Sequence, residues 1–126
     1  MKIKMAQGAR LNEVCKKLST KSLPIKVSYK LAKTLLQLED EIGFYKSQYV
    51  NLLQNYGETD EEGNFIPGPN DSIKIKKGLE EECAKKVAEL DGLEFEIPNF
   101  ELSLDDLEGI ELSTAEVAVL VPFIKE

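Results

Sequence analysis

The clearest pattern along the chain is a regular alternation of apolar positions in its first half. They are separated by 4, 3, 4, 3, 4, 3 and 4 residues, at Leu31, Leu35, Leu38, Ile42, Tyr45, Tyr49, Leu52 and Tyr56. This spacing is typical of a coiled-coil seam and predicts one helix from about Ile25 to Tyr56. Such a helix is roughly 45 Å long and is not stable alone, so another element must cover its seam.

A second apolar stripe predicts the covering element. It consists of Leu79, Cys83, Val87 and Leu90, and it indicates a shorter helix packed antiparallel on the first, in a hairpin over about residues 25–90. Gly57 is placed to cap the first helix, and Asp71 or Ser72 to begin the second. A homodimer would bury the part of the seam that the shorter helix leaves bare.

The tip of this hairpin contains a polar turn and short alternating segments. Glu62-Gly63-Asn64 is typical of a turn, and Pro67, Gly68 and Pro69 disfavour a helix after it. A two-strand flap would pair Phe65-Ile66 with residues 73–75. Such an exposed tip is a candidate contact surface.

Shorter patterns flank the hairpin. Residues 2–5 alternate like an edge strand, and the stripe Leu11, Val14, Cys15 and Leu18 predicts a short helix that ends near residues 19–22. Cys15 and Cys83 both lie among apolar residues, which indicates two buried thiols. Near the C-terminus, Ser113 to Glu116 has the form of a capping box, which predicts a helix from Thr114 to about Val121.

The segment 93–104 alternates on both sides of Pro98-Asn99. A two-residue turn there would pair Ile97 with Phe100 and Phe95 with Leu102, with all apolar side chains on one face. Proline cannot take the positive φ of tight hairpin turns, so a bent extended segment is the other interpretation.

These elements together predict a mainly α fold with a small β element (α+β). We expect a single domain over residues 1–126. It would contain a long helical hairpin, a short N-terminal helix, short strands near 2–5 and 93–104, a short C-terminal helix, and an acidic tail over 91–126.

Composition and charge narrow the class of protein. The 126 residues are 42% hydrophobic and 31% charged, as in an ordinary globular protein. Residues 1–35 carry nine Lys/Arg and one acid, a net charge of +8, whereas residues 36–126 carry seven and twenty-two, a net charge of −15. An acidic whole disfavours nucleic acid as the partner, and the two halves should fold against each other or meet a partner of opposite charge. With no membrane-length apolar run and no signal peptide, we expect a cytoplasmic protein.

The residue types also argue against catalysis. The chain has no histidine, which removes the commonest general base and metal ligand. We therefore expect no enzyme and no cofactor. One weak alternative is a divalent-metal module in residues 58–69, where Glu58, Asp60 and Glu62 take EF-hand positions, but Pro69 stands where a calcium loop needs a bidentate glutamate.

The layout of the chain resembles a known class of proteins. The carrying segments are LPIKVSYKLAKTLLQLEDEIGFYKSQYVNLLQNYG at 23–57, DEEGNF at 60–65 and LDDLEGIELSTAEVAVLVPFI at 104–124. In this order they resemble small uncharacterised proteins encoded by phages and prophages of low-GC Gram-positive bacteria. The resemblance implies a protein made in an infected or lysogenic host cell, in its cytoplasm or in the virion, and accessory proteins of this kind tend to act by binding.

The predicted function is therefore a non-enzymatic phage or prophage accessory protein that binds another protein, of the phage or of the host. Candidate contact residues are the seam tyrosines Tyr45, Tyr49 and Tyr56, whose alternative role is core packing, and Phe65 and Ile66 at the tip. The same class includes a virion or assembly component and an inhibitor of a host defence protein. An inhibitor would use the acidic tail, which has ten Asp/Glu and one Lys over 91–126.

Overall fold

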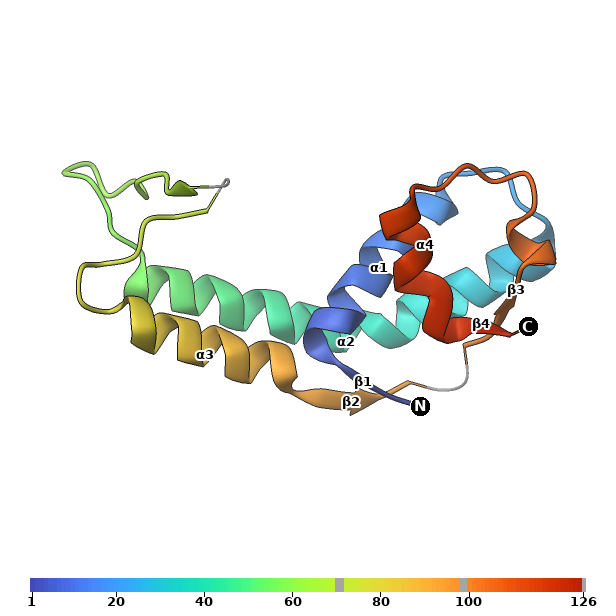
Figure 1. Ribbon diagram of the computed structural model, residues 1–126, viewed down its shortest axis with the longest axis horizontal. Helices are drawn as coiled ribbons and strands as arrows, with labels where there is room; N and C mark the ends of the chain where they lie inside the picture. Colours follow the sequence, from blue (N-terminus) through green and yellow to red (C-terminus); the bar gives the residue numbers. More distant parts are fainter. Residues whose placement is uncertain (70–71, 98–99, 126) are drawn as a thin grey trace.

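The protein is mainly helical, as predicted. The computed structural model describes residues 1–69, 72–97 and 100–125, and Figure 1 shows a body of packed helices with a helical arm extending from it. The helices in this part of the chain are α1 (Met5–Ser19), α2 (Ile25–Tyr56), α3 (Glu80–Gly92) and α4 (Thr114–Leu120), with 3-10 turns η2 (Asp105–Leu107) and η3 (Val121–Phe123).

Helix α2 runs through both the body and the arm, and it has the predicted bounds. It begins directly after Pro24, and it ends where the Gly57 N–H donates to the Leu53 carbonyl at 2.7 Å. Its buried face consists of Val27, Leu31, Thr34, Leu38 and Ile42. Two different helices cover the seam: α1 packs along the half of α2 in the body, and α3 packs along the half in the arm (Figure 1).

Helix α3 forms the predicted hairpin with α2 but begins later than expected. It starts at Glu80 after Leu79, so Ser72 does not begin it, and Asp71 lies outside the described residues. Residues 72–76 are instead used for backbone pairing at the arm tip, and a turn at Gly78, with φ of 87°, leads into the helix. The covered part of the seam is correspondingly shorter.

The short strands near the two chain termini pair with the strands of the segment 93–104. Strand β1 (Lys2–Lys4) is antiparallel to β2 (Glu94–Glu96), with Ile3 opposite Phe95. Strand β3 (Leu102–Ser103) is parallel to β4 (Ile124–Lys125), with Leu102 opposite Ile124. The hairpin interpretation of 93–104 is therefore wrong, because each half of the segment finds its partner elsewhere. Pro98 and Asn99 lie outside the described residues.

The core lies in the body. Side chains from α1, α2, α4 and the strands form one buried cluster, in which the Phe100 and Phe123 rings lie 5.6 Å apart between centroids. Cys15 and Cys83 are both free and buried, as predicted. The capping box at Ser113 and Glu116 is also confirmed, with both of its hydrogen bonds formed.

The basic first third meets the acidic tail at the surface of the body. Lys17 Nζ lies 2.7 Å from Glu116 Oε2, and Lys30 Nζ lies 3.1 Å from Asp106 Oδ2. Both pairs join α1 or α2 to the C-terminal segment. The expectation that the two oppositely charged parts fold against each other is confirmed at these two contacts.

Candidate protein-binding groove

The arm tip is a flap of three short segments, residues 57–60, 64–68 and 72–76. Each segment bonds to the other two through the backbone. The Glu58 N–H donates to Lys74 at 2.8 Å, Lys74 to Ile66 at 2.8 Å, and Ile66 to Glu58 at 3.0 Å. The predicted pairing with residues 73–75 is present for Ile66, whose carbonyl accepts from Lys74, but Phe65 pairs with Thr59 instead. The segment after Gly57 thus completes a closed ring of hydrogen bonds.

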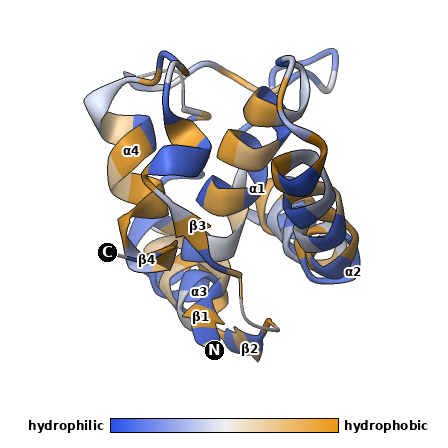
Figure 2. Cartoon of the chain, turned by 90° about the vertical axis from the view of Figure 1, so that its right-hand side faces the viewer, coloured by the Kyte–Doolittle hydropathy of each residue, from blue (hydrophilic) through white to orange (hydrophobic). Residues whose placement is uncertain are grey.

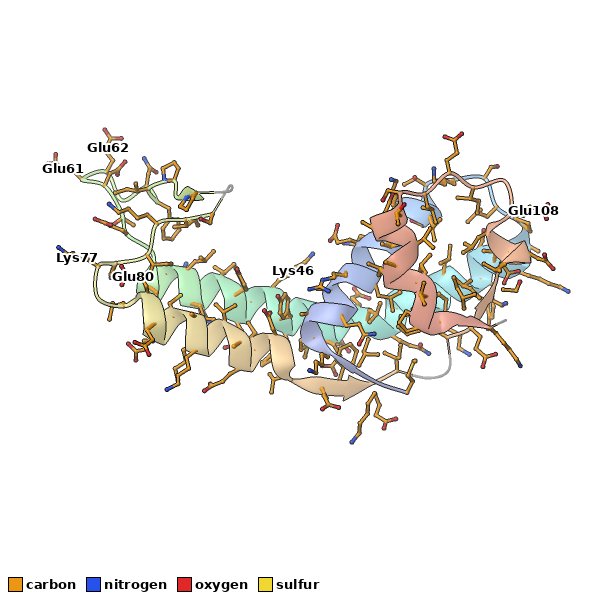
Figure 3. The ribbon with its side chains drawn as sticks, viewed as in Figure 1. Lys46, Glu61, Glu62, Lys77, Glu80 and Glu108 are labelled. Atoms are coloured by element: carbon orange, nitrogen blue, oxygen red, sulfur yellow. The ribbon has the colours of Figure 1, made fainter. Side chains whose placement is uncertain are left out.

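The acids of the flap stabilise the turn. Asp60 Oδ1 accepts the backbone N–H groups of Glu62 and Asn64 at 2.9 and 3.0 Å. Glu58 lies 3.4 Å from the Lys74 ammonium, and Glu62 points outward from the flap (Figure 3). In the part of the chain that the structure describes, no three His, Cys, Asp or Glu residues are grouped to hold a metal ion. The arrangement is that of a polar turn.

Tyr45 connects the two helices of the arm. Its side chain is half-buried against the core cluster, and its hydroxyl donates to Asp91 Oδ1 at 2.7 Å. Burial and the Asp91 carboxylate raise the pKa of Tyr45 to about 12. The side chain is therefore committed to joining α2 to α3, and its surface is only partly available to another molecule.

Tyr49 lies one turn further along α2, with its ring centroid 6.0 Å from that of Tyr45, and it lines a groove. The groove has a volume of about 580 Å³ and lies between α2, α3 and the last flap segment. Its lining is mostly apolar: Tyr49, Leu52 and Leu53 from α2, Cys83, Ala84, Val87 and Ala88 from α3, and Ile73 and Ile75 from the flap.

Three polar residues also line this groove: Ser72, Glu80 and Asp91. Burial raises the pKa of the Cys83 thiol, so the thiol stays protonated and is a poor nucleophile. A mostly apolar lining with two acids suits a binding surface better than a reaction centre.

The remaining candidate residues hold the flap in place. The Phe65 ring lies so close to Gly57 that a Cβ there would be 2.7 Å from it. Ile66 is half-buried and takes part in the ring of backbone hydrogen bonds. Burial, with a smaller contribution from the Glu82 carboxylate, raises the pKa of the half-buried Tyr56. Only Tyr49 of the five predicted residues lines the groove.

The sequence interpretation did not assign the rest of the groove lining to a site. Its signal was present in Ala84 and Ala88, small residues at i and i+4 on one face of α3. Side chains this small leave space beside Val87. What the pattern could not indicate is that Ile73 and Ile75 would fold back to close one side of that space.

Comparisons with known proteins identify no relative of this chain. No protein-family model matches the chain, and no curated protein or solved structure matches it. In the described residues no helix combines the length and hydropathy that crossing a membrane requires.

Proposed function

We propose that this protein is a non-enzymatic accessory protein of a phage or prophage, and that it acts by binding another protein through the groove of its arm. The apolar groove between α2, α3 and the flap carries this proposal. Its aromatic and aliphatic lining is the kind of surface that anchors an apolar segment of a partner. The phage setting rests on the sequence resemblance alone.

Charge specifies the chemistry of the partner. Residues 44–92 contain ten acids and six lysines, a net charge of −4, and Glu80 and Asp91 are among the residues that line the groove. The occupant is therefore an amphipathic segment with an apolar face and flanking Lys or Arg residues, because such a segment matches both the lining and the charge.

The host-defence inhibitor is the second candidate within this class. Its proposed surface was the acidic tail, but Glu116 and Asp106 are already paired with Lys17 and Lys30. The arm also carries acids, such as Glu61 and Glu62 at the outer end of the flap, which point away from it (Figure 3). For an inhibitor we propose the same groove as the contact surface, with the acids of the arm as additional contacts.

Site-specific photo-crosslinking tests the proposal. A photoreactive amino acid at Val87 in the groove should capture a partner in phage-infected host cells, and the same group at Val121, which is 58% exposed on the body, is the matched control. Ala88→Arg, which fills the groove with a large cation, should abolish capture at Val87 and reduce affinity for the purified partner at least about tenfold. Equal capture at both positions, or binding that Ala88→Arg leaves unchanged, would exclude the groove.

The identity of the captured protein separates the two roles. A phage structural protein indicates a virion or assembly factor. A single host defence protein indicates an inhibitor.

A further inference from the structure

Helix α2 has a second apolar stripe, on the face opposite its buried seam. Ile25, Tyr29, Ala32, Leu36, Gly43 and Val50 fall within a narrow arc of the helix, roughly 140° from the buried stripe at 100° per residue. The exposed fractions are 83% for Ile25, 67% for Tyr29, 71% for Leu36 and 50% for Val50. Figure 2, viewed from the end of the body, places α2 at the margin of the molecule.

The stripe is large enough to be a contact surface. From Ile25 to Val50 it runs about 38 Å, and at a width of about 10 Å it covers about 400 Å², which is the size of the largest, often functional, apolar patch on a typical monomer. A groove of about 590 Å³ continues it towards α1, lined by Asn12 and Lys16 from α1 and by Ala32, Leu35, Leu36, Glu39, Ile42, Gly43 and Lys46 from α2.

We propose that a second copy of this chain covers the stripe, through an antiparallel pairing of the two α2 helices about a two-fold axis near Gln37. In this register Ile25 lies opposite Val50 of the second copy, and Ala32 lies opposite Gly43. The same register sets Tyr29 opposite Lys46 and Leu36 opposite Glu39 of the second copy, so the apolar pairs are those at the two ends and at Ala32 and Gly43. An added Cβ at Gly43 would have no neighbour within 4 Å in one chain, so space for close approach of the helices exists there.

The distribution of charge along α2 favours an antiparallel pairing with the α2 helix of a second copy. Lys26, Lys30 and Lys33 stand in the first part of α2, and Glu39, Asp40 and Glu41 stand in the middle. A parallel pairing would set the lysines beside lysines and acids beside acids. The antiparallel pairing sets Lys33 beside Asp40 of the second copy, twice by symmetry, and within the described residues neither side chain forms an ion pair in its own chain.

The stripe also indicates how strong the pairing is. Glu39 and Lys46 interrupt it, and two such faces would bury about 800 Å² in total, which is below the standard size and in the range of weak, transient interfaces. Self-association should therefore be reversible, with a dissociation constant in the micromolar range.

Sedimentation analysis over a concentration series tests the surface. The wild type should pass from monomer to dimer, whereas Leu36→Glu should remain monomeric with unchanged helix content, because Leu36 is exposed in the single chain. Lys33→Glu should weaken the dimer at least about tenfold by placing two acids together, and adding Asp40→Lys should restore it. A wild type that stays monomeric to several hundred micromolar, or a charge-swapped variant that fails to regain the dimer, would overturn the proposal.

Cysteine crosslinking tests the direction. Ile25→Cys mixed with Val50→Cys should form a disulfide-linked dimer under mild oxidation, while either variant alone should not. Crosslinking between two Ile25→Cys chains would indicate a parallel pair and contradict the antiparallel pairing.

Discussion

Gly8 lies in close contact with an aromatic ring of the body. It is buried in α1, and a Cβ at this position would lie 2.7 Å from the Phe95 ring. Gly8→Ala should destabilise the protein by about 1–3 kcal/mol, because the ring must shift in a filled core, although alanine favours a helix by up to about 1 kcal/mol. Chemical denaturation measures the difference.

Two further variants isolate the cause. Gly92→Ala is the matched control, since nothing lies within 4 Å of a Cβ there and the residue is also helical; it should change stability little. Combining Gly8→Ala with Phe95→Leu should cost less than the sum of the two single changes. A Gly8→Ala protein as stable as the wild type would refute the close contact.

The candidate tyrosines show what a sequence pattern indicates about single residues. All three occupy the predicted seam, but Tyr45 is half-buried and bonded to Asp91, whereas Tyr49 borders the groove. The spacing of apolar residues defines a face of the helix and so places them together. It does not indicate which part of that face another helix covers. That depends on where α3 begins, and α3 begins only at Glu80.

Helix α4 is attached to α1 by the ion pair between Glu116 and Lys17, and the Glu116 carboxylate can be protonated at low pH. Glu116 accepts from Lys17 Nζ and from the Ser113 N–H, both at 2.9 Å, and these contacts lower its pKa from 4.5 to about 2. Because the pKa in the folded state lies below the unfolded value, the contribution to stability is fully present above about pH 4.5 and is lost as the pH falls towards 2.

Glu116→Gln should remove this pH-dependent contribution. Denaturation at a series of pH values should show the wild type more stable than the variant near pH 7, with the difference disappearing between about pH 4.5 and 2. Glu108→Gln, at a side chain that points into solvent (Figure 3), should leave the free energy of unfolding unchanged at pH 7. A Glu116→Gln difference that is constant down to pH 2 would contradict the role of the Lys17 pair.

Elements were predictable where local patterns determine them. The bounds of α2 follow from a seam of eight residues ended by Gly57, and those of α4 follow from its capping box. Strand pairing was not predictable in this way, because alternation in 93–104 indicates which side chains are buried but not which strand supplies the backbone partner. The flap segment after Gly57 was missed for the same reason, since the hydrogen bonds of Glu58 join it to Ile66 and Lys74, which lie eight and sixteen residues further along the chain.

Across the whole molecule, stability should fall from the body to the arm. The contiguous core cluster includes buried α2 side chains as far as Ile42, and it excludes Cys83 and Leu90, the buried residues of α3. A region with fewer buried apolar contacts opens at a lower free energy. We therefore expect amides of α1 and of residues 31–42 to exchange hydrogen more slowly than those of residues 45–56 and α3.

Hydrogen exchange with mass spectrometry tests this gradient within one continuous helix. Equal protection along the whole of α2 would show that the arm is as stable as the body and would contradict it. If the gradient is present, a partner bound in the groove contacts α2, α3 and the flap together, and protection of the arm should rise on binding while that of the body stays constant. The groove would then lie in the region of the molecule that binding can stabilise most.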